Sequence, residues 1–251
     1  MSSGSWSAAA RPLPTRAVRV WVCASLVPMA IHVLRLFGDA SEMALGALTI
    51  GSTVALVIAV LRNRPPVVGP WVAFIAAGLL LAVGAITRES VGSTGDLTAD
   101  RSLLPDFFTM PGYVCLIVSL VWLLKLRHEQ LQQPGIGVDA ALMALGSLVG
   151  AWTVLIDPVF STREAAPIAV VAVSVYPAVS VFLVSIAARL AFGPGERSVS
   201  HRLLVAGMGV LLVGDVLYFF TDTGVIAPPG RFVDLPYGIG YMIMAAAALH
   251  P

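Results

Sequence analysis

The sequence predicts an all-α membrane protein: a polytopic transmembrane bundle of about eight helices with its N-terminus in the cytoplasm. Hydrophobic residues make up 58% of the 251 residues and charged residues only 12%, whereas a soluble domain carries about 25% charged residues. The mean hydropathy is +0.90. This composition leaves too little polar surface to cover a water-facing globule, which excludes an ordinary soluble enzyme. A net charge of +1 also gives no electrostatic footprint for nucleic acid.

Four apolar runs lie in the first half of the chain, behind a polar tail at residues 1–16 that is expected to lie in the cytoplasm. Each run has about the 20 residues that a helix needs to cross a bilayer. The proline-containing segment 62–66 separates the second run from the third, and a long acidic loop separates the third from the fourth. The predicted spans of this half are 17–37, 43–61, 70–87 and 105–126.

Four more runs of similar length follow in the second half. Short segments rich in glycine, proline and polar residues separate them, at 132–137, 192–197 and 223–230. Pro177 is expected to bend the sixth helix. The predicted spans of this half are 138–156, 167–190, 203–221 and 235–250.

Lysine and arginine are distributed unevenly between the two sides of the predicted bundle. With the N-terminus in the cytoplasm and eight spans, ten of the 15 Lys and Arg residues fall on the inner side and five on the outer side. The positive-inside rule therefore places both ends inside, as a multi-pass protein of the inner (plasma) membrane. The last apolar run continues to His250 and Pro251 without a basic anchor, so we expect the chain to be the leading part of a longer protein.

Asp215 is the clearest candidate for a functional residue, because an ionisable group inside a membrane span is costly and tends to have a function. Tyr218 follows it by three residues and shares its helix face. Four further polar residues fall in the outer half of their spans, and together with Asp215 and Tyr218 they predict a polar layer that lines a ligand-binding cavity open to the outside. These four are His32, Tyr113, Tyr176 and Tyr241.

Structural roles are the alternative for each of these residues. A buried Asp often joins neighbouring helices by accepting hydrogen bonds from Tyr, Ser or Trp, and tyrosines near span ends are commonly interfacial anchors. His32 lies one turn after Pro28 and can bond the carbonyl that a proline kink releases.

No nucleophile elbow, zinc-protease motif, P-loop or dinucleotide fingerprint occurs in the sequence. The sequence therefore predicts no catalytic residue, no metal site and no cofactor in this chain.

A series of short motifs runs through the second half of the chain, residues 137–251. They are Asp139-Ala140-Ala141, Trp152, Asp157-Pro158, Tyr176-Pro177, Leu203-Leu204, Asp215 with Tyr218, Tyr237 with Gly240-Tyr241, and the ending Ala246-Ala247-Ala248-Leu249-His250-Pro251. In their order and spacing these residues resemble the N-terminal multi-helix membrane region of actinobacterial cyclic-di-GMP signalling proteins, which carry GGDEF and often EAL domains downstream. Relatives often carry Asp in the sixth helix where this chain has Ser180, so the polar network that the resemblance implies is altered here.

The resemblance implies a membrane sensory or anchoring module. Such a module would regulate a cytoplasmic GGDEF or EAL output domain in cis, in a homodimer, within a full-length diguanylate cyclase or phosphodiesterase; neither motif occurs in this chain. A small-molecule transporter or permease is the alternative, supported by eight spans, proline-broken helices and a buried Asp. An intramembrane enzyme acting on lipid is a third hypothesis, resting on Asp215 and His32 at similar depth. A purely structural role is the fourth.

Overall fold

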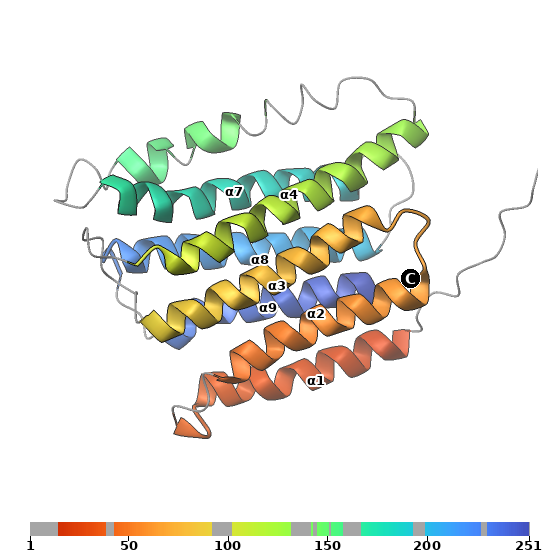
Figure 1. Ribbon diagram of the computed structural model, residues 1–251, viewed down its shortest axis with the longest axis horizontal. Helices are drawn as coiled ribbons and strands as arrows, with labels where there is room; N and C mark the ends of the chain where they lie inside the picture. The colour runs from red at the N-terminus through yellow and green to blue at the C-terminus, as the bar shows by residue number, and fades with distance from the viewer. Residues whose placement is uncertain are drawn as a thin grey trace, which may run out of the picture.

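The computed structural model confirms the predicted all-α fold (Figure 1). It describes residues 15–38, 43–91, 102–131, 142, 145–150, 152–157, 167–192, 199–226 and 230–250. No strand occurs within these residues, and seven of their helices are long and apolar enough to cross a membrane. The chain is therefore a multi-pass membrane protein.

Seven long helices and one π-helical turn are defined in the described residues. Their hydrophobic residues are not confined to one stripe, because the outward faces contact lipid and the inward faces contact other helices. The elements are α1 (Thr15–Leu34), α2 (Met43–Asn63), α3 (Gly69–Val91), α4 (Leu104–Leu131), η2 (Trp152–Ile156), α7 (Pro167–Phe192), α8 (Val199–Asp222) and α9 (Gly230–Leu249).

Helix ends differ from the predicted spans by a few residues. The first helix ends at Leu34 rather than at residue 37, because Arg35 adopts a left-handed backbone with φ of 49° and Gly38 follows at 60°. The last helix begins at Gly230 rather than at residue 235. Hydropathy marks the part of a helix that lies in hydrocarbon, whereas the helix itself continues into the polar boundary where Asp234 is tolerated.

Seven of the 19 residues of the predicted span 138–156 lie outside the described residues, as does nearly all of the predicted tail 1–16. The described parts of that span, 142, 145–150 and 152–156, are helical. In Figure 1, α4 and α7 run in the same direction, so the chain between Leu131 and Pro167 passes from one end of the bundle to the other. This arrangement is compatible with about eight spans.

Helix α9 lies in the centre of one half of the bundle and packs against α1, α2 and α8, while α7 lies between α4 and α8. Side chains from all three neighbours of α9 donate hydrogen bonds to backbone carbonyls of α9 or of His250, the residue that directly follows it. Trp21 Nε1 donates to Met242 O at 3.0 Å, Asn63 Nδ2 to Ala248 O at 3.4 Å, and Ser200 Oγ to His250 O at 3.1 Å. These bonds tie the second half of α9 to α1, α2 and α8.

Glycines allow α8 and α9 to approach closely. A Cβ atom on Gly207 would lie 2.8 Å from Met244 Cγ and 3.4 Å from Gly240 O, and a Cβ on Gly240 would lie 3.2 Å from the Leu211 side chain. Small residues at a helix interface of this kind let two backbones come together. In contrast, a Cβ on Gly209, two residues along α8, would meet nothing within 4 Å.

We therefore expect opposite effects from two alanine substitutions on the same helix. Gly207→Ala overpacks the α8–α9 contact and should destabilise the folded protein by about 1–3 kcal/mol. Gly209→Ala adds a methyl group in open space and should be neutral or slightly stabilising, because alanine favours helix. Thermal unfolding in detergent, followed by size-exclusion chromatography, measures both. Equal melting temperatures for the two variants would contradict the close approach.

Candidate functional site

The carboxylate of Asp215 is the centre of a buried polar network. Asp215 lies on α8 and is 1% exposed. Its Oδ1 atom accepts hydrogen bonds from the Tyr113 hydroxyl of α4 at 2.7 Å and from the Tyr237 hydroxyl of α9 at 2.8 Å. Its Oδ2 atom accepts a hydrogen bond from Ser180 Oγ of α7 and lies 2.8 Å from the Tyr113 hydroxyl. One side chain therefore joins four helices.

The backbone next to Asp215 is shaped to admit one of these donors. A Cβ atom on Gly214 would lie 3.1–3.2 Å from atoms of the Tyr237 ring, so glycine leaves the ring just enough room against α8. The ring packs on the helix surface, and its hydroxyl reaches the carboxylate of the next residue. The Gly214-Asp215 pair thus supplies both the space for Tyr237 and its acceptor.

A second polar cluster lies beside the first, where α3 ends and α4 begins. Arg88 Nη2 lies 3.5 Å from Asp106 Oδ1 and 3.4 Å from the Tyr176 hydroxyl. The Tyr176 hydroxyl donates a hydrogen bond to Asp106 Oδ1. The Arg88 guanidinium carbon also lies 4.5 Å from the centre of the Tyr218 ring and 5.7 Å from that of Tyr176, within the range of cation–π attraction.

Aromatic contacts connect the two clusters. The ring centres of Tyr113 and Tyr176 are 5.6 Å apart, and those of Tyr176 and Tyr218 are 6.1 Å apart, both in edge-to-face arrangements. Tyr113 is bonded to Asp215 and Tyr176 to Asp106, so the rings form a continuous link. We call the resulting set of eight side chains the polar network. Its members are Arg88, Asp106, Tyr113, Tyr176, Ser180, Asp215, Tyr218 and Tyr237.

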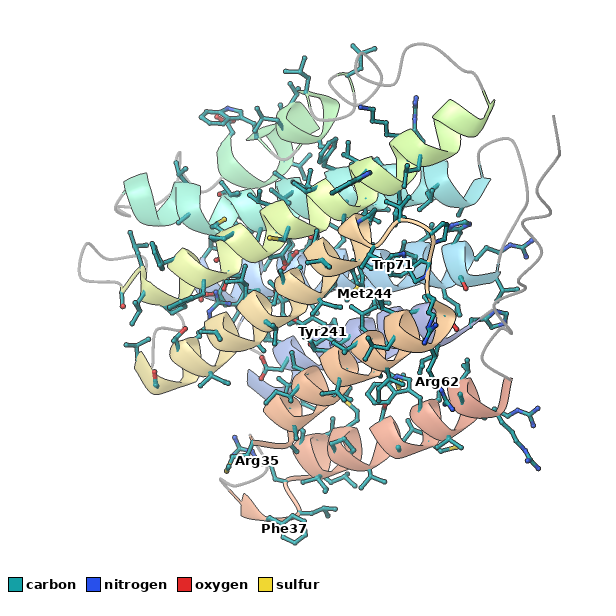
Figure 2. All side chains as sticks on the ribbon, turned by 45° about the vertical axis from the view of Figure 1, so that its right-hand side comes forward. Arg35, Phe37, Arg62, Trp71, Tyr241 and Met244 are labelled. Carbon is teal, nitrogen blue, oxygen red and sulfur yellow. The ribbon has the colours of Figure 1, made fainter. Side chains whose placement is uncertain are left out.

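The polar network lies toward one end of the bundle. Arg88 is the last residue of the apolar stretch of α3, and Asp215 lies about 10 Å along α8 from Asp222, the last residue of that helix. In Figure 1 this is the end where α1 connects to α2, opposite the end where α9 finishes. Figure 2 marks the same end with Arg35 and Phe37, while Arg62 lies at the other end of α2. In the predicted orientation, the network lies on the outer side.

Four of the six predicted site residues come together in the structure, and two do not. Asp215, Tyr218, Tyr176 and Tyr113 all belong to the polar network. The buried His32 lies apart from it, with Nε2 3.7 Å from Asp234 Oδ2, a contact between α1 and α9.

Tyr241 faces a small, mainly apolar cavity between α2, α3, α4 and α9, next to the hydroxyl groups of α2. The three hydroxyls of α2 donate to carbonyls of their own helix one turn earlier, those of Leu45, Leu48 and Thr49. In Figure 2, Tyr241 and Met244 lie between α2 and α3 near the middle of the bundle.

Four of the eight members of the polar network are not among the predicted site residues. Arg88 directly follows the predicted span 70–87, and Asp106 lies at the very start of the predicted span 105–126. Ser180 and Tyr237 enter the sequence analysis only through the family resemblance. A signal for two of them was present, because Ser180 follows Tyr176 by one helical turn and Tyr113 follows Asp106 by two turns, so each pair shares a helix face.

The arrangement joins helices through hydrogen bonds to one buried carboxylate. Asp215 is surrounded by hydroxyl donors, and within the described residues no group of three His, Cys, Asp or Glu side chains could hold a metal ion. Comparison with protein-family models, with curated proteins and with solved structures finds no match to this chain. Fold and site therefore define the class on their own: a multi-pass helical membrane protein with a buried polar network at one end.

Proposed function

We propose that this bundle is a membrane sensory and anchoring module of the inner membrane, which regulates a cytoplasmic cyclic-di-GMP output domain in cis. One observation carries the sensory part: Asp215 alone connects α4, α7, α8 and α9 through hydrogen bonds to their side chains. A ligand that changes any of these bonds acts on four helices together. The resemblance of residues 137–251 to the membrane region of GGDEF and EAL proteins supports cyclic-di-GMP chemistry as the output.

Sensing requires two helix arrangements for which the ligand has different affinities. The polar network supplies a ligand-responsive element near the proposed outer side. The bonds from Trp21, Asn63 and Ser200 to α9 supply the transmission, because they make α9 move together with α1, α2 and α8. In the proposed orientation α9 ends on the cytoplasmic side, where a shift changes the geometry of a dimeric output domain.

The test removes single hydroxyl groups from the network within the complete reading frame, expressed in bacterial membranes. Tyr113→Phe and Tyr237→Phe each delete one hydrogen bond to Asp215 and should change cyclic-di-GMP turnover by about fivefold or more, the usual lower range of allosteric coupling. Tyr241→Phe is the matched control, because the Tyr241 hydroxyl has no hydrogen bond within the described part of the chain. Turnover is measured by chromatography of the nucleotide products.

Two results would contradict this proposal in different ways. Turnover that is unchanged in both network variants would leave anchoring without sensing. A membrane fraction with no cyclic-di-GMP turnover at all, from a complete reading frame that lacks GGDEF and EAL sequences, would remove the output class.

A further inference from the structure

The Arg88 guanidinium occupies a site with the features of a cation-binding box. The faces of Tyr218 and Tyr176 lie 4.5 Å and 5.7 Å from its central carbon, and Asp106 Oδ1 lies 3.5 Å from Nη2. Aromatic faces together with a carboxylate are what proteins use to bind guanidinium and ammonium groups. We call these three side chains the aromatic box, and Arg88 is the cation that fills it.

Arg88 is held in the box by weak contacts. Its hydrogen-bond distances to Asp106 and Tyr176 are 3.5 Å and 3.4 Å, whereas charge-assisted bonds of this kind are usually about 2.7–2.9 Å long. Its Nε atom is buried and has no hydrogen-bond partner within the described residues. The side chain is 20% exposed, so it lies where it can leave toward the end of the bundle.

The charges around the box favour a cation over an anion. The polar network contains one arginine and two carboxylates, those of Asp106 and Asp215. If the Arg88 side chain moved out, two carboxylates and the four tyrosine rings of the network would remain. An anion entering the network would meet both carboxylates. A cation would instead replace the positively charged Arg88 guanidinium.

We propose that the aromatic box binds a small organic cation, an alkylguanidinium or alkylammonium compound, and that Arg88 is its internal competitor. Binding places the cationic group between Tyr218, Tyr176 and Asp106 and displaces the end of α3 from α4, α7 and α8. The claim that this cation is the signal rests on the proposed sensory function. The claim that the aromatic box binds a cation rests on the geometry of the box alone.

The experiment measures binding of ethylguanidinium to the full chain in lipid nanodiscs by isothermal titration calorimetry. Arg88→Ala removes the competitor and should lower the Kd for ethylguanidinium at least tenfold relative to the unaltered chain. Arg35→Ala removes an exposed arginine from the same end of the bundle and should leave the Kd unchanged. Adding Asp106→Asn to Arg88→Ala should abolish the gain, because the carboxylate of the box is lost.

The outcomes separate this proposal from the proposed function. Equal affinity in Arg88→Ala and in the unaltered chain, or a gain that survives Asp106→Asn, would overturn the cation site whatever the output assay shows. If Arg88→Ala does not fold, Arg88→Gln keeps most of the side-chain volume without the charge, and the same tenfold gain is expected. Tight binding together with unchanged turnover in the Tyr113→Phe and Tyr237→Phe variants would confirm the site and refute the sensory function.

Discussion

Replacing Asp215 with alanine is expected to lower the free energy of unfolding by about 2–5 kcal/mol. The substitution leaves three hydroxyl donors without their acceptor, those of the buried Tyr113 and Ser180 and of the partly buried Tyr237. Hydrogen bonds between membrane helices contribute about 0.6 kcal/mol on average and up to about 1.7 kcal/mol. A buried donor left without a partner costs about 1–3 kcal/mol. Three such losses at one point place Asp215→Ala among the most destabilising single substitutions in the chain.

Unfolding by sodium dodecyl sulfate in mixed micelles, followed by tryptophan fluorescence, measures this loss. Asp157→Ala is the control, because Asp157 is exposed and surface substitutions of this kind usually change stability by less than about 0.5 kcal/mol. A loss at Asp215 no larger than that at Asp157 would show that the carboxylate does not join the helices.

Ser180→Asp is expected to lower the free energy of unfolding by a comparably large amount. The cause is repulsion between two carboxylates rather than the loss of hydrogen bonds. Ser180 Oγ donates to Asp215 Oδ2, so an aspartate at this position places a second carboxylate against the first. Two like charges about 4 Å apart repel by about 4 kcal/mol at the effective dielectric constant of a protein site near its surface. Ser180→Asn introduces a side chain of nearly the same shape as aspartate but without the charge, so it should destabilise the protein much less. The yield of monodisperse protein and its melting temperature report the difference.

A variant in which the serine and the aspartate of this contact exchange positions provides the control. The double variant Ser180→Asp with Asp215→Ser keeps one carboxylate and one hydroxyl but moves the carboxylate from α8 to α7. It should recover part of the stability that Ser180→Asp loses, because the like-charge pair is gone. A double variant that is less stable than Ser180→Asp alone would contradict the contact between residues 180 and 215.

The membrane fold and the importance of Asp215 could be predicted from the sequence, for the same physical reason. Charges are costly in hydrocarbon, so they accumulate at span ends and their spacing marks the helices. A charge left inside a span therefore stands out. The same reasoning failed for Arg88 and Asp106, because they lie where an apolar run ends and the start of a loop is an equally good explanation.

The composition of the network could not be predicted, because a sequence gives the depth of a residue but not which neighbour its helix face meets. His32 and Tyr241 share the predicted outer half with Asp215, yet His32 contacts Asp234 and Tyr241 faces the cavity beside α2. Tyr237 lies one turn before Tyr241, on the same face of α9, and reaches Asp215. The close approach at Gly214, which depends on the packing of two helices, decides this difference.

The central claim is that the Asp215 carboxylate joins helices through the hydroxyl groups that surround it. A double-mutant cycle between Asp215→Ala and Tyr113→Phe tests it most directly, because Tyr113→Phe removes only the hydroxyl that donates to Asp215. The cycle is measured by unfolding in mixed micelles. The structure predicts that Tyr113→Phe destabilises the unaltered chain by about 0.5–1.5 kcal/mol and has almost no effect once Asp215 is alanine. Equal losses in both backgrounds would mean that the two residues do not interact, and would contradict the claim.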